Sequence, residues 1–275
     1  MASTPSVPLS DRPDSAIAPG PAAGSADPVS VDPAVATLRA WIDECPAGGM
    51  VFFGGAGVST ESGIPDFRSS GGLFARQYPY PAEVMVSHSF FEARPAEFFD
   101  FYFDRMVALD AEPNRAHRKL AELERRGTLR AVVTQNIDGL HQKAGSSNVL
   151  ELHGSVHRNR CLACGRRFTA EEAVALHAAA PDGVPRCPSC GGIVKPDVVL
   201  YEEQLDEAVL EASVEAISRA SLMVVAGTSL VVYPAAGLLS YFQGDRLAIV
   251  NLSPTSADQS ADLVVAAKVG EVFDF

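Results

Sequence analysis

Residues 50–57 read MVFFGGAG, and this stretch decides the fold. A short apolar run that ends in glycines is typical of a buried parallel strand leading into a phosphate-binding turn. Gly55 and Gly57 match the first two glycines of the dinucleotide-binding fingerprint, but Thr60 stands where the third is required. We therefore expect the backbone N–H groups of Ala56, Gly57 and the helix start that follows to bind an anion such as a pyrophosphate.

Alternating strand and helix patterns follow this first strand. Further buried strands are predicted in five apolar runs, at 129–135, 148–152, 198–200, 221–227 and 246–252. One helix is predicted over 33–44 with Asp32 as its N-cap, and another over 115–126, opened by Asn114 and closed by Gly127. The alternation predicts an α/β fold with a Rossmann-like parallel sheet, helices on both faces, and ligands beyond the carboxyl ends of the strands.

Two stretches interrupt this alternation. Residues 71–127 look mainly helical and rich in aromatic side chains, and residues 156–197 contain four of the cysteines. We expect these stretches to form a smaller inserted domain, made of a helical module and a structural zinc module. The Rossmann-like domain then consists of residues 31–70, 128–155 and 198–275.

The composition of the chain limits its class. With 275 residues, of which 47% are hydrophobic and 20% charged, the chain is long enough for a large core. Residues 1–30 are dominated by Pro, Ala, Ser and Gly and are expected to be disordered. They do not resemble a secretory signal, and no apolar run is long enough to span a bilayer, so a cytoplasmic, non-membrane protein is expected. A net charge of −12 argues against a nucleic-acid partner.

Four cysteines form two C-x-x-C pairs, Cys161 with Cys164 and Cys187 with Cys190. In a cytoplasmic chain such pairs indicate a metal site, and four thiolates close a tetrahedral, structural Zn²⁺ site, with iron as the lesser alternative. The basic surplus around these cysteines is cancelled by the negative charge of a four-thiolate zinc centre, which leaves no nucleic-acid footprint. The fifth cysteine, Cys45, is expected to be a small, partly buried apolar residue.

Polar side chains crowd the ends of the first two predicted strands. The first loop carries Ser59, Ser62, Asp66, Phe67 and Arg68, and the second strand is followed by Gln135, Asn136 and Asp138. Hydride transfer does not need so many polar groups around the nicotinamide ribose, whereas chemistry at the glycosidic carbon does. The pattern therefore favours NAD as a substrate that is cleaved.

Several motifs together resemble the sirtuin family of NAD-dependent protein deacylases, of the bacterial type. They are GAGVSTESGIPDFR (55–68), TQNIDGLHQKAG (134–145), ELHGSV (151–156), the two C-x-x-C pairs, GTSLVVYPAA (227–236) and IVNLSPT (249–255). They occur in order and with sensible spacing, and the likeness runs from about residue 32 to the C-terminus.

The resemblance implies that NAD is cleaved while an acylated lysine is deacylated. The acyl oxygen attacks the ribose carbon that bears nicotinamide, and the acyl group ends on ADP-ribose. His153 matches the general base, for which a near-neutral imidazole is suited. Asn136 and Asp138 match the catalytic-site residues that hold the nicotinamide-side ribose and carboxamide. The other histidines, His141 among them, are expected at the surface or at helix caps.

The resemblance also assigns the remaining site residues. The NAD contacts it implies are Gly55, Ala56, Gly57, Ser59, Asp66, Phe67, Arg68, Gln135, Asn136, Asp138, Gly227, Thr228, Ser229, Asn251, Leu252 and Ala267. An acylated protein substrate is expected to add as a strand along Val198, Val199, Leu200 and Tyr201. Glu202 stands where the family commonly has glycine, which puts a charge beside that strand.

Alternative activities are weighed against deacetylation. Tyr102 and Arg105 resemble the pair with which some family members bind succinyl or malonyl groups, although such a spacing is also ordinary on an amphipathic helix. Protein mono-ADP-ribosylation would use the same NAD site. Hydride transfer and a non-catalytic NAD-binding module are less favoured. We therefore predict a deacetylase that acts as a monomer.

Overall fold

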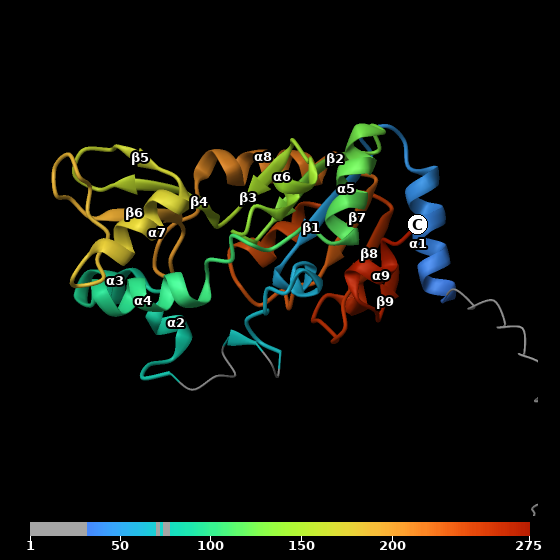
Figure 1. Ribbon diagram of the computed structural model, residues 1–275. Coiled ribbons are helices and arrows are strands. Elements are labelled where there is room, and N and C mark those ends of the chain that lie inside the picture. The colour runs from blue at the N-terminus through green and yellow to red at the C-terminus, as the bar shows by residue number, and fades with distance from the viewer. Residues whose placement is uncertain (1–31, 70–71, 74–77) are drawn as a thin grey trace, which may run out of the picture. The chain divides into compact units, whose positions relative to one another are not determined.

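The computed structural model describes residues 32–69, 72–73 and 78–275, and the disorder expected for residues 1–30 lies outside these ranges. Its main sheet is parallel throughout and has the strand order β3-β2-β1-β7-β8-β9 (Figure 1). The strands are β1 (Met50–Gly54), β2 (Leu129–Thr134), β3 (Val149–Glu151), β7 (Leu222–Ala226), β8 (Arg246–Val250) and β9 (Leu263–Val265). This is the Rossmann order, with the topological switch point between β1 and β7.

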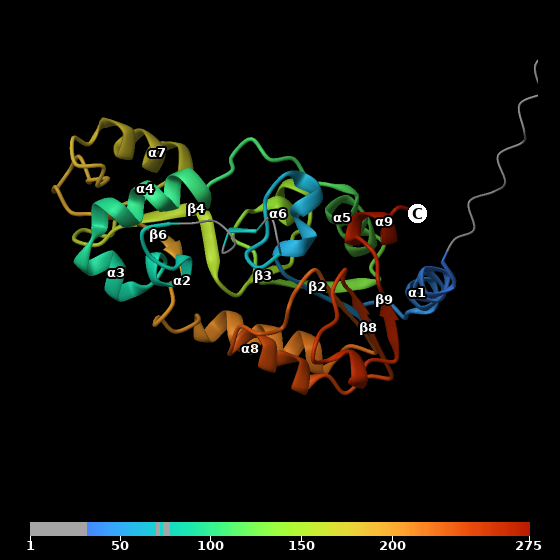
Figure 2. The same cartoon turned by 90° about the horizontal axis from the view of Figure 1, so that it is seen from below.

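Successive side chains of β1 point to opposite faces of the sheet and enter the apolar core on each face. Met50 and Phe52 point into one apolar cluster, and Val51 and Phe53 point into the other. The first cluster is covered by α1 (Pro33–Glu44), α5 (Arg115–Arg125) and α9 (Val269–Val272), and the second by α8 (Glu207–Ser218) and η4 (Ala235–Tyr241). Figure 2 shows α8 on one side of the sheet and α5 and α9 on the other. Both faces are therefore buried, as the apolar strands require.

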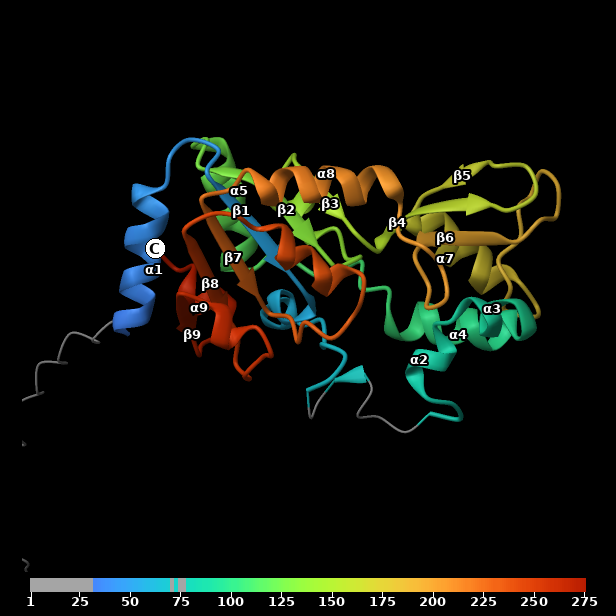
Figure 3. The ribbon, with the colours of Figure 1, turned by 180° about the vertical axis from the view of Figure 1, so that it is seen from behind.

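The smaller part of the chain has its own antiparallel sheet, in the order β5-β4-β6. Its elements are β4 (Gly154–Cys161), β5 (Arg167–Phe168), α7 (Ala170–Ala179) and β6 (Val194–Val198). Against them pack α2 (Ala82–Met85), α3 (His88–Ala93) and α4 (Pro95–Arg105), whose ribbons lie beside this sheet in Figure 3. These helices bury an aromatic cluster. The remaining short elements are α6 (Leu140–Ala144), η1 (Ala56–Val58), η2 (Thr60–Ser62) and η5 (Asp258–Ser260).

Most of the predicted elements are confirmed. The runs at 129–135, 148–152, 221–227 and 246–252 form β2, β3, β7 and β8. Asp32 caps α1 by accepting a 2.8 Å hydrogen bond from the Ala34 N–H, and Asn114 caps α5. Gly127 follows α5 with φ +81°, a left-handed conformation that glycine adopts without strain.

Two expectations about domain boundaries are wrong. The segment 198–200 is not a strand of the parallel sheet: Val198 ends β6, and Val198 and Leu200 are buried by the aromatic cluster. An apolar run this short does not reveal which core it enters. Helix α5 does not belong to the helical module expected over 71–127, because Leu120 and Leu123 pack beneath the main sheet. Within the described ranges, no helix is long and apolar enough to cross a membrane.

Candidate active site

The loops that follow β1 and β7 meet at the switch point of the sheet. The Gly57 N–H donates a 2.8 Å hydrogen bond to the Gly227 carbonyl. A Cβ added to Gly57 would lie 2.7 Å from the Gly227 Cα, and one added to Gly55 would lie 2.7 Å from the Thr228 Cβ. The glycines are needed for this close approach of two backbones, which removes the Gly57 N–H from the donors expected to bind phosphate. The helix start expected after them is a pair of short 3₁₀ turns, η1 and η2.

Ser59 is the centre of a buried network that ties the first loop to the end of β2. Its hydroxyl, in a residue only 1% exposed, donates to Asp138 Oδ2 at 2.6 Å and accepts from Asn136 Nδ2 at 3.0 Å. Asp138 Oδ1 accepts a further 2.9 Å hydrogen bond from the Leu140 N–H at the start of α6. Both oxygens of Asp138 are thus engaged inside the protein, so the contacts favour a positioning role for this carboxylate over direct catalysis.

A second set of contacts joins the ends of β2, β7 and β8. Gln135 Nε2 donates to Thr228 Oγ1 at 2.9 Å, and Asn251 Nδ2 donates to the Thr228 carbonyl at 3.2 Å. The Gln135 N–H is bonded to the carbonyl of Gly54 at the end of β1. Side chains that follow β2, β7 and β8 therefore meet beside the backbone end of β1, at one edge of the sheet.

His153 follows β3 and is anchored to the same edge. Its Nδ1 lies 2.9 Å from the Gln135 carbonyl oxygen. Because a carbonyl only accepts, Nδ1 must carry the proton, and Nε2 is left with a free lone pair. Burial lowers the pKa of His153, although the bond to Gln135 opposes the shift. The imidazole is therefore neutral near pH 7, in the tautomer that can remove a proton through Nε2.

Two other histidines lie deeper than expected. His141, predicted at the surface or at a cap, is buried, and within the described residues neither ring nitrogen has a hydrogen-bond partner. Its ring centroid lies 4.6 Å from that of His117. His117 is also buried, but it does cap α5, where its Nδ1 accepts from the Asn114 N–H. Burial lowers the pKa of both, to about 4 for His117.

The other expected NAD contacts lie at the margin of this network. Asp66 closes a local turn in which its Oδ1 accepts from the N–H groups of Arg68 and Ser69, and Phe67 lies within that turn. Ser229 and Leu252 are exposed beyond β7 and β8. Ala267 packs beside the core under the sheet, after β9. No hydrogen bond in the described part of the chain joins Ala267 to the network around Ser59.

The expected substrate segment, Val198 to Tyr201, is already hydrogen-bonded within the protein. The N–H groups of Val199 and Tyr201 donate to the carbonyls of His153 and Val86. The Leu200 N–H donates to the Glu203 carboxylate. An added strand therefore cannot use these three donors as they stand, and strand addition along this segment stays a prediction.

Glu202 has φ +76°, a conformation that glycine adopts more easily. Its carboxylate accepts hydrogen bonds from the N–H and hydroxyl of Ser89 in α3. These contacts tie the helical module to the end of the expected substrate segment. They also mean that the Glu202 carboxylate, expected beside the substrate, is already hydrogen-bonded within the protein.

Tyr102 and Arg105 do not form a joint carboxylate-binding pair. Tyr102 is 1% exposed, stacks on Phe98 in the aromatic cluster, and has a pKa raised by burial. The Arg105 guanidinium binds Asp104 at 2.7 Å and lies over the Tyr78 ring. Two residues three apart on α4 have thus taken the packing and surface roles that helical spacing also allows.

The four cysteines of the C-x-x-C pairs come together beyond the end of β4. Their sulfurs lie within 4.8 Å of one another, with Cys161 and Cys190 at 3.4 Å and Cys164 and Cys187 at 3.8 Å. A tetrahedral Zn²⁺ ion with bonds of about 2.3 Å needs sulfur separations of about 3.8 Å. The set fits a structural zinc ion, because four thiolates leave no position for water.

Sequence reasoning missed one residue that supports the site. Asn114 caps α5, and its Nδ2 also donates a 2.7 Å hydrogen bond to the Val58 carbonyl in η1. The residue is buried, so this bond fixes the first loop against α5. The cap signal located Asn114, but nothing in the sequence indicated its second partner.

Comparisons with known proteins identify the family of this chain. The model of the Sir2 family matches residues 55–234. This chain belongs to the Sir2 family. Its sirtuin relatives include NAD-dependent protein deacetylases of Cutibacterium acnes, 56% identical over 85% of this chain and 93% of the relative, and of Clostridium acetobutylicum, 54% identical over 82% and 91%.

Solved Sir2 structures share the fold. A Sir2 protein with a deacetylated p53 peptide and 3'-O-acetyl ADP ribose superposes with a TM-score of 0.80 at 38% identity, covering 87% of this chain and 95% of that one. Sir2 with a p53 peptide and NAD+ gives 0.76 at 40% identity, covering 86% and 94%. The sirtuin fold expected from the sequence is confirmed.

Proposed function

We propose that this Sir2 protein is an NAD-dependent protein-lysine deacetylase. It breaks the bond between nicotinamide and ribose, forms a bond from the acyl oxygen of an acetylated lysine to that ribose carbon, and then uses one water molecule to release the lysine amine. The products are nicotinamide, deacetylated lysine and O-acetyl-ADP-ribose. The observation that carries the proposal is His153, a neutral imidazole whose Nε2 has no hydrogen-bond partner within the described residues, at the edge of the sheet where a dinucleotide is expected. The relatives named NAD-dependent protein deacetylase support it.

The residues at this edge fit NAD by their chemistry. Gln135, Asn136 and Thr228 offer amide and hydroxyl groups to ribose and phosphate oxygens. Ser62 Oγ is buried and has no hydrogen-bond partner within the described residues, so a polar ligand at this loop would satisfy it. NAD enters as the substrate that supplies the reactive ribose carbon and the acyl acceptor.

His153 serves as the general base in this proposal. The Gln135 carbonyl holds the Nδ1 proton, so the Nε2 lone pair removes a proton from a ribose hydroxyl and makes that oxygen a nucleophile. Asn136 and Asp138 act by fixing Ser59 and the first loop. The zinc ion has a structural role, since its four thiolate ligands leave no site for substrate.

The alternatives are separated by their products. Desuccinylation through Tyr102 and Arg105 has no support in the contacts of these residues. Mono-ADP-ribosylation uses the same crevice and would attach ADP-ribose to protein. A monomeric state, a cytoplasmic location and the lack of a nucleic-acid partner stay predictions from the sequence.

The test is an assay of NAD with an acetyl-lysine peptide, comparing wild type with His153→Ala. We expect nicotinamide and deacetylated peptide from wild type, and a loss of at least about 100-fold in kcat/KM for the variant, because general base catalysis is removed. His177→Ala is the matched control, since His177 lies in α7, outside the site. Full activity of His153→Ala would contradict the proposal.

A further inference from the structure

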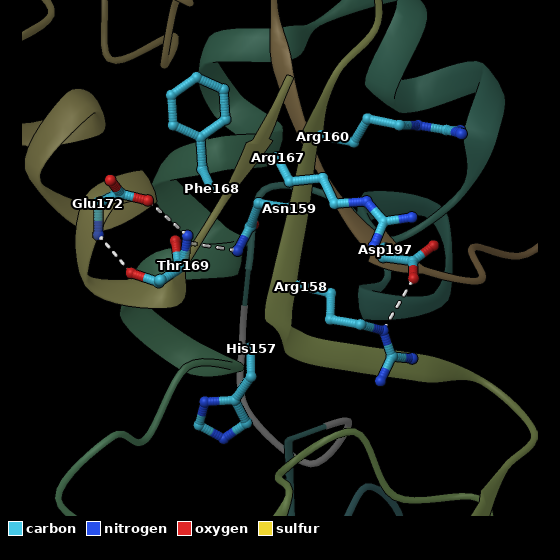
Figure 4. A pocket seen from close by; sticks show the side chains of 9 residues that line it. All are labelled: His157, Arg158, Asn159, Arg160, Arg167, Phe168, Thr169, Glu172 and Asp197. Atoms are coloured by element: carbon cyan, nitrogen blue, oxygen red, sulfur yellow. Dashed lines mark hydrogen bonds and ion pairs between the residues drawn. The ribbon is translucent and has the colours of Figure 1, made fainter. Parts of the chain in front are cut away.

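A cavity of about 420 Å³ opens beside β4 in the smaller part of the chain. Its lining includes His157, Arg158, Arg160 and Arg167, together with the carboxylates of Glu172 and Asp197. Figure 4 shows the three arginines on one side of β4 and Glu172 on the other. None of these side chains has a role in the proposed reaction, so the accumulation of positive charge needs another cause.

Three cations stand in register across the small sheet. Arg160 of β4 is paired with Arg167 of β5 on one side and with Lys195 of β6 on the other. Like charges directly opposite one another destabilise a sheet. Lys195 is compensated by Glu203, 3.3 Å from its Nζ. In the part of the chain that the structure describes, no carboxylate forms an ion pair with Arg160 or Arg167.

The two carboxylates of the cavity are already engaged. Arg158 binds Asp197 at 3.0 Å and also Glu151 at 2.6 Å. Glu172 accepts a 2.8 Å hydrogen bond from the Thr169 N–H in the capping box of α7. The chain has 34 acidic and 22 basic residues, so carboxylates that could neutralise Arg160 and Arg167 are not scarce.

An alternative role for Arg160 and Arg167 is to balance the negative charge of the thiolates at the zinc site. The strand pattern argues against it, because Arg160 is exposed while the neighbouring Cys161 is buried, and successive side chains of a strand point to opposite faces. Arg166, next to the cysteine loop, binds Ser189 beside Cys190 and is the arginine placed to serve that site.

We propose that Arg160 and Arg167 bind acidic side chains of the protein substrate, at positions that flank its acetylated lysine. This inference rests on the proposed function. Asp197 in the cavity directly precedes Val198, where the expected substrate segment begins. Lys195, which pairs with Arg160, stands three residues before Val198, so an extended peptide that rises about 3.3 Å per residue would come level with Arg160 within about three residues of that point. Guanidinium groups suit carboxylates, which they bind through two parallel hydrogen bonds.

Binding is tested without the reaction. The probe is a fluorescein-labelled hexaglutamate peptide, which has no lysine, and fluorescence anisotropy at low salt measures its Kd. We expect Arg160→Gln/Arg167→Gln to weaken binding by about 5- to 10-fold, the effect of two exposed ion pairs. The control Arg125→Gln/Arg219→Gln removes the same charge from α5 and from the end of α8, and should bind as wild type does. Equal weakening in both, or no binding by wild type, would overturn the proposal. Stronger binding of an oligothymidylate at the same arginines would also overturn it.

Substrate preference is tested with two acetyl-lysine peptides, one with glutamate and one with glutamine at the flanking positions. Wild type should show the lower KM for the glutamate peptide, and Arg160→Gln/Arg167→Gln should abolish that difference while kcat and zinc content stay unchanged and Tm does not fall. Loss of zinc with an unchanged KM difference would assign the arginines to the metal site and refute the proposal. If wild type deacetylates neither peptide, the proposed function fails. The hexaglutamate titration still tests whether Arg160 and Arg167 bind acidic side chains.

Discussion

At the scale of single residues, the protonation of His153 is set by two contacts. Burial lowers its pKa below the 6.5 of a free imidazole, and the Gln135 carbonyl fixes the proton on Nδ1. At the pH where a free imidazole is half protonated, a smaller fraction of His153 is therefore protonated. We expect the acid limb of the kcat/KM profile, measured from about pH 5 to about pH 9, to have its midpoint below 6.5. A midpoint above 6.5 would show that another group, or a differently placed imidazole, acts as the base.

Gly57 gives a second prediction at this scale. In Gly57→Ala the new Cβ would lie 2.7 Å from the Gly227 Cα, and neither backbone can yield as a flexible side chain would. We expect a loss of about 1 to 3 kcal/mol in the free energy of unfolding, and reduced kcat/KM, because the two loops of the site are pushed apart. Gly237→Ala is the control, since its Cβ meets nothing nearer than 3.6 Å. Equal urea midpoints for the two variants would argue against this tight contact.

At the scale of elements, α5 and α6 bury a pair of histidines under the sheet. The pKa of His117 is lowered to about 4 and that of His141 is also lowered, from 6.5 in the unfolded chain. Between these values the unfolded chain binds more protons, so stability is lost as the pH falls below about 6.5, by up to about 3 kcal/mol from His117 alone. We expect His141→Leu, followed by urea unfolding at about pH 7.5 and about pH 5.5, to show a smaller decrease than wild type. His177→Gln should retain the full decrease, and identical decreases in all three proteins would contradict this account.

The same elements show what the sequence can and cannot predict. Asn114 and Gly127 mark both ends of α5, because caps are local signals. The partner of α5 is not local, so the helix was assigned to the wrong module, and the burial of His141 was missed for the same reason. At the site, the predicted ends of the parallel strands were enough to place Gln135, Asn136, His153 and Thr228 at one edge of the sheet. The contact that occupies the Gly57 N–H comes from a loop 170 residues later and has no sequence signal.

At the scale of the whole molecule, the zinc module is held by four residues from two distant loops. Because zinc binding contributes directly to folding free energy, we expect Cys161→Ala to lose zinc and to unfold or aggregate, as judged by metal analysis and size-exclusion chromatography. Cys45→Ala is the matched control, since Cys45 lies at the end of α1 and outside the cluster. A folded, active, zinc-free Cys161→Ala protein would rule out a structural role for the metal.

In the proposed reaction, the ribose carbon of NAD reacts and ADP-ribose receives the acetyl group. The most direct measurement is the product stoichiometry of purified protein with NAD and an acetyl-lysine peptide, by chromatography and mass spectrometry. We predict nicotinamide, deacetylated peptide and O-acetyl-ADP-ribose in equal amounts, and none without the acetylated peptide. Formation of NADH, of ADP-ribosylated protein, or of nicotinamide without deacetylation would contradict the account.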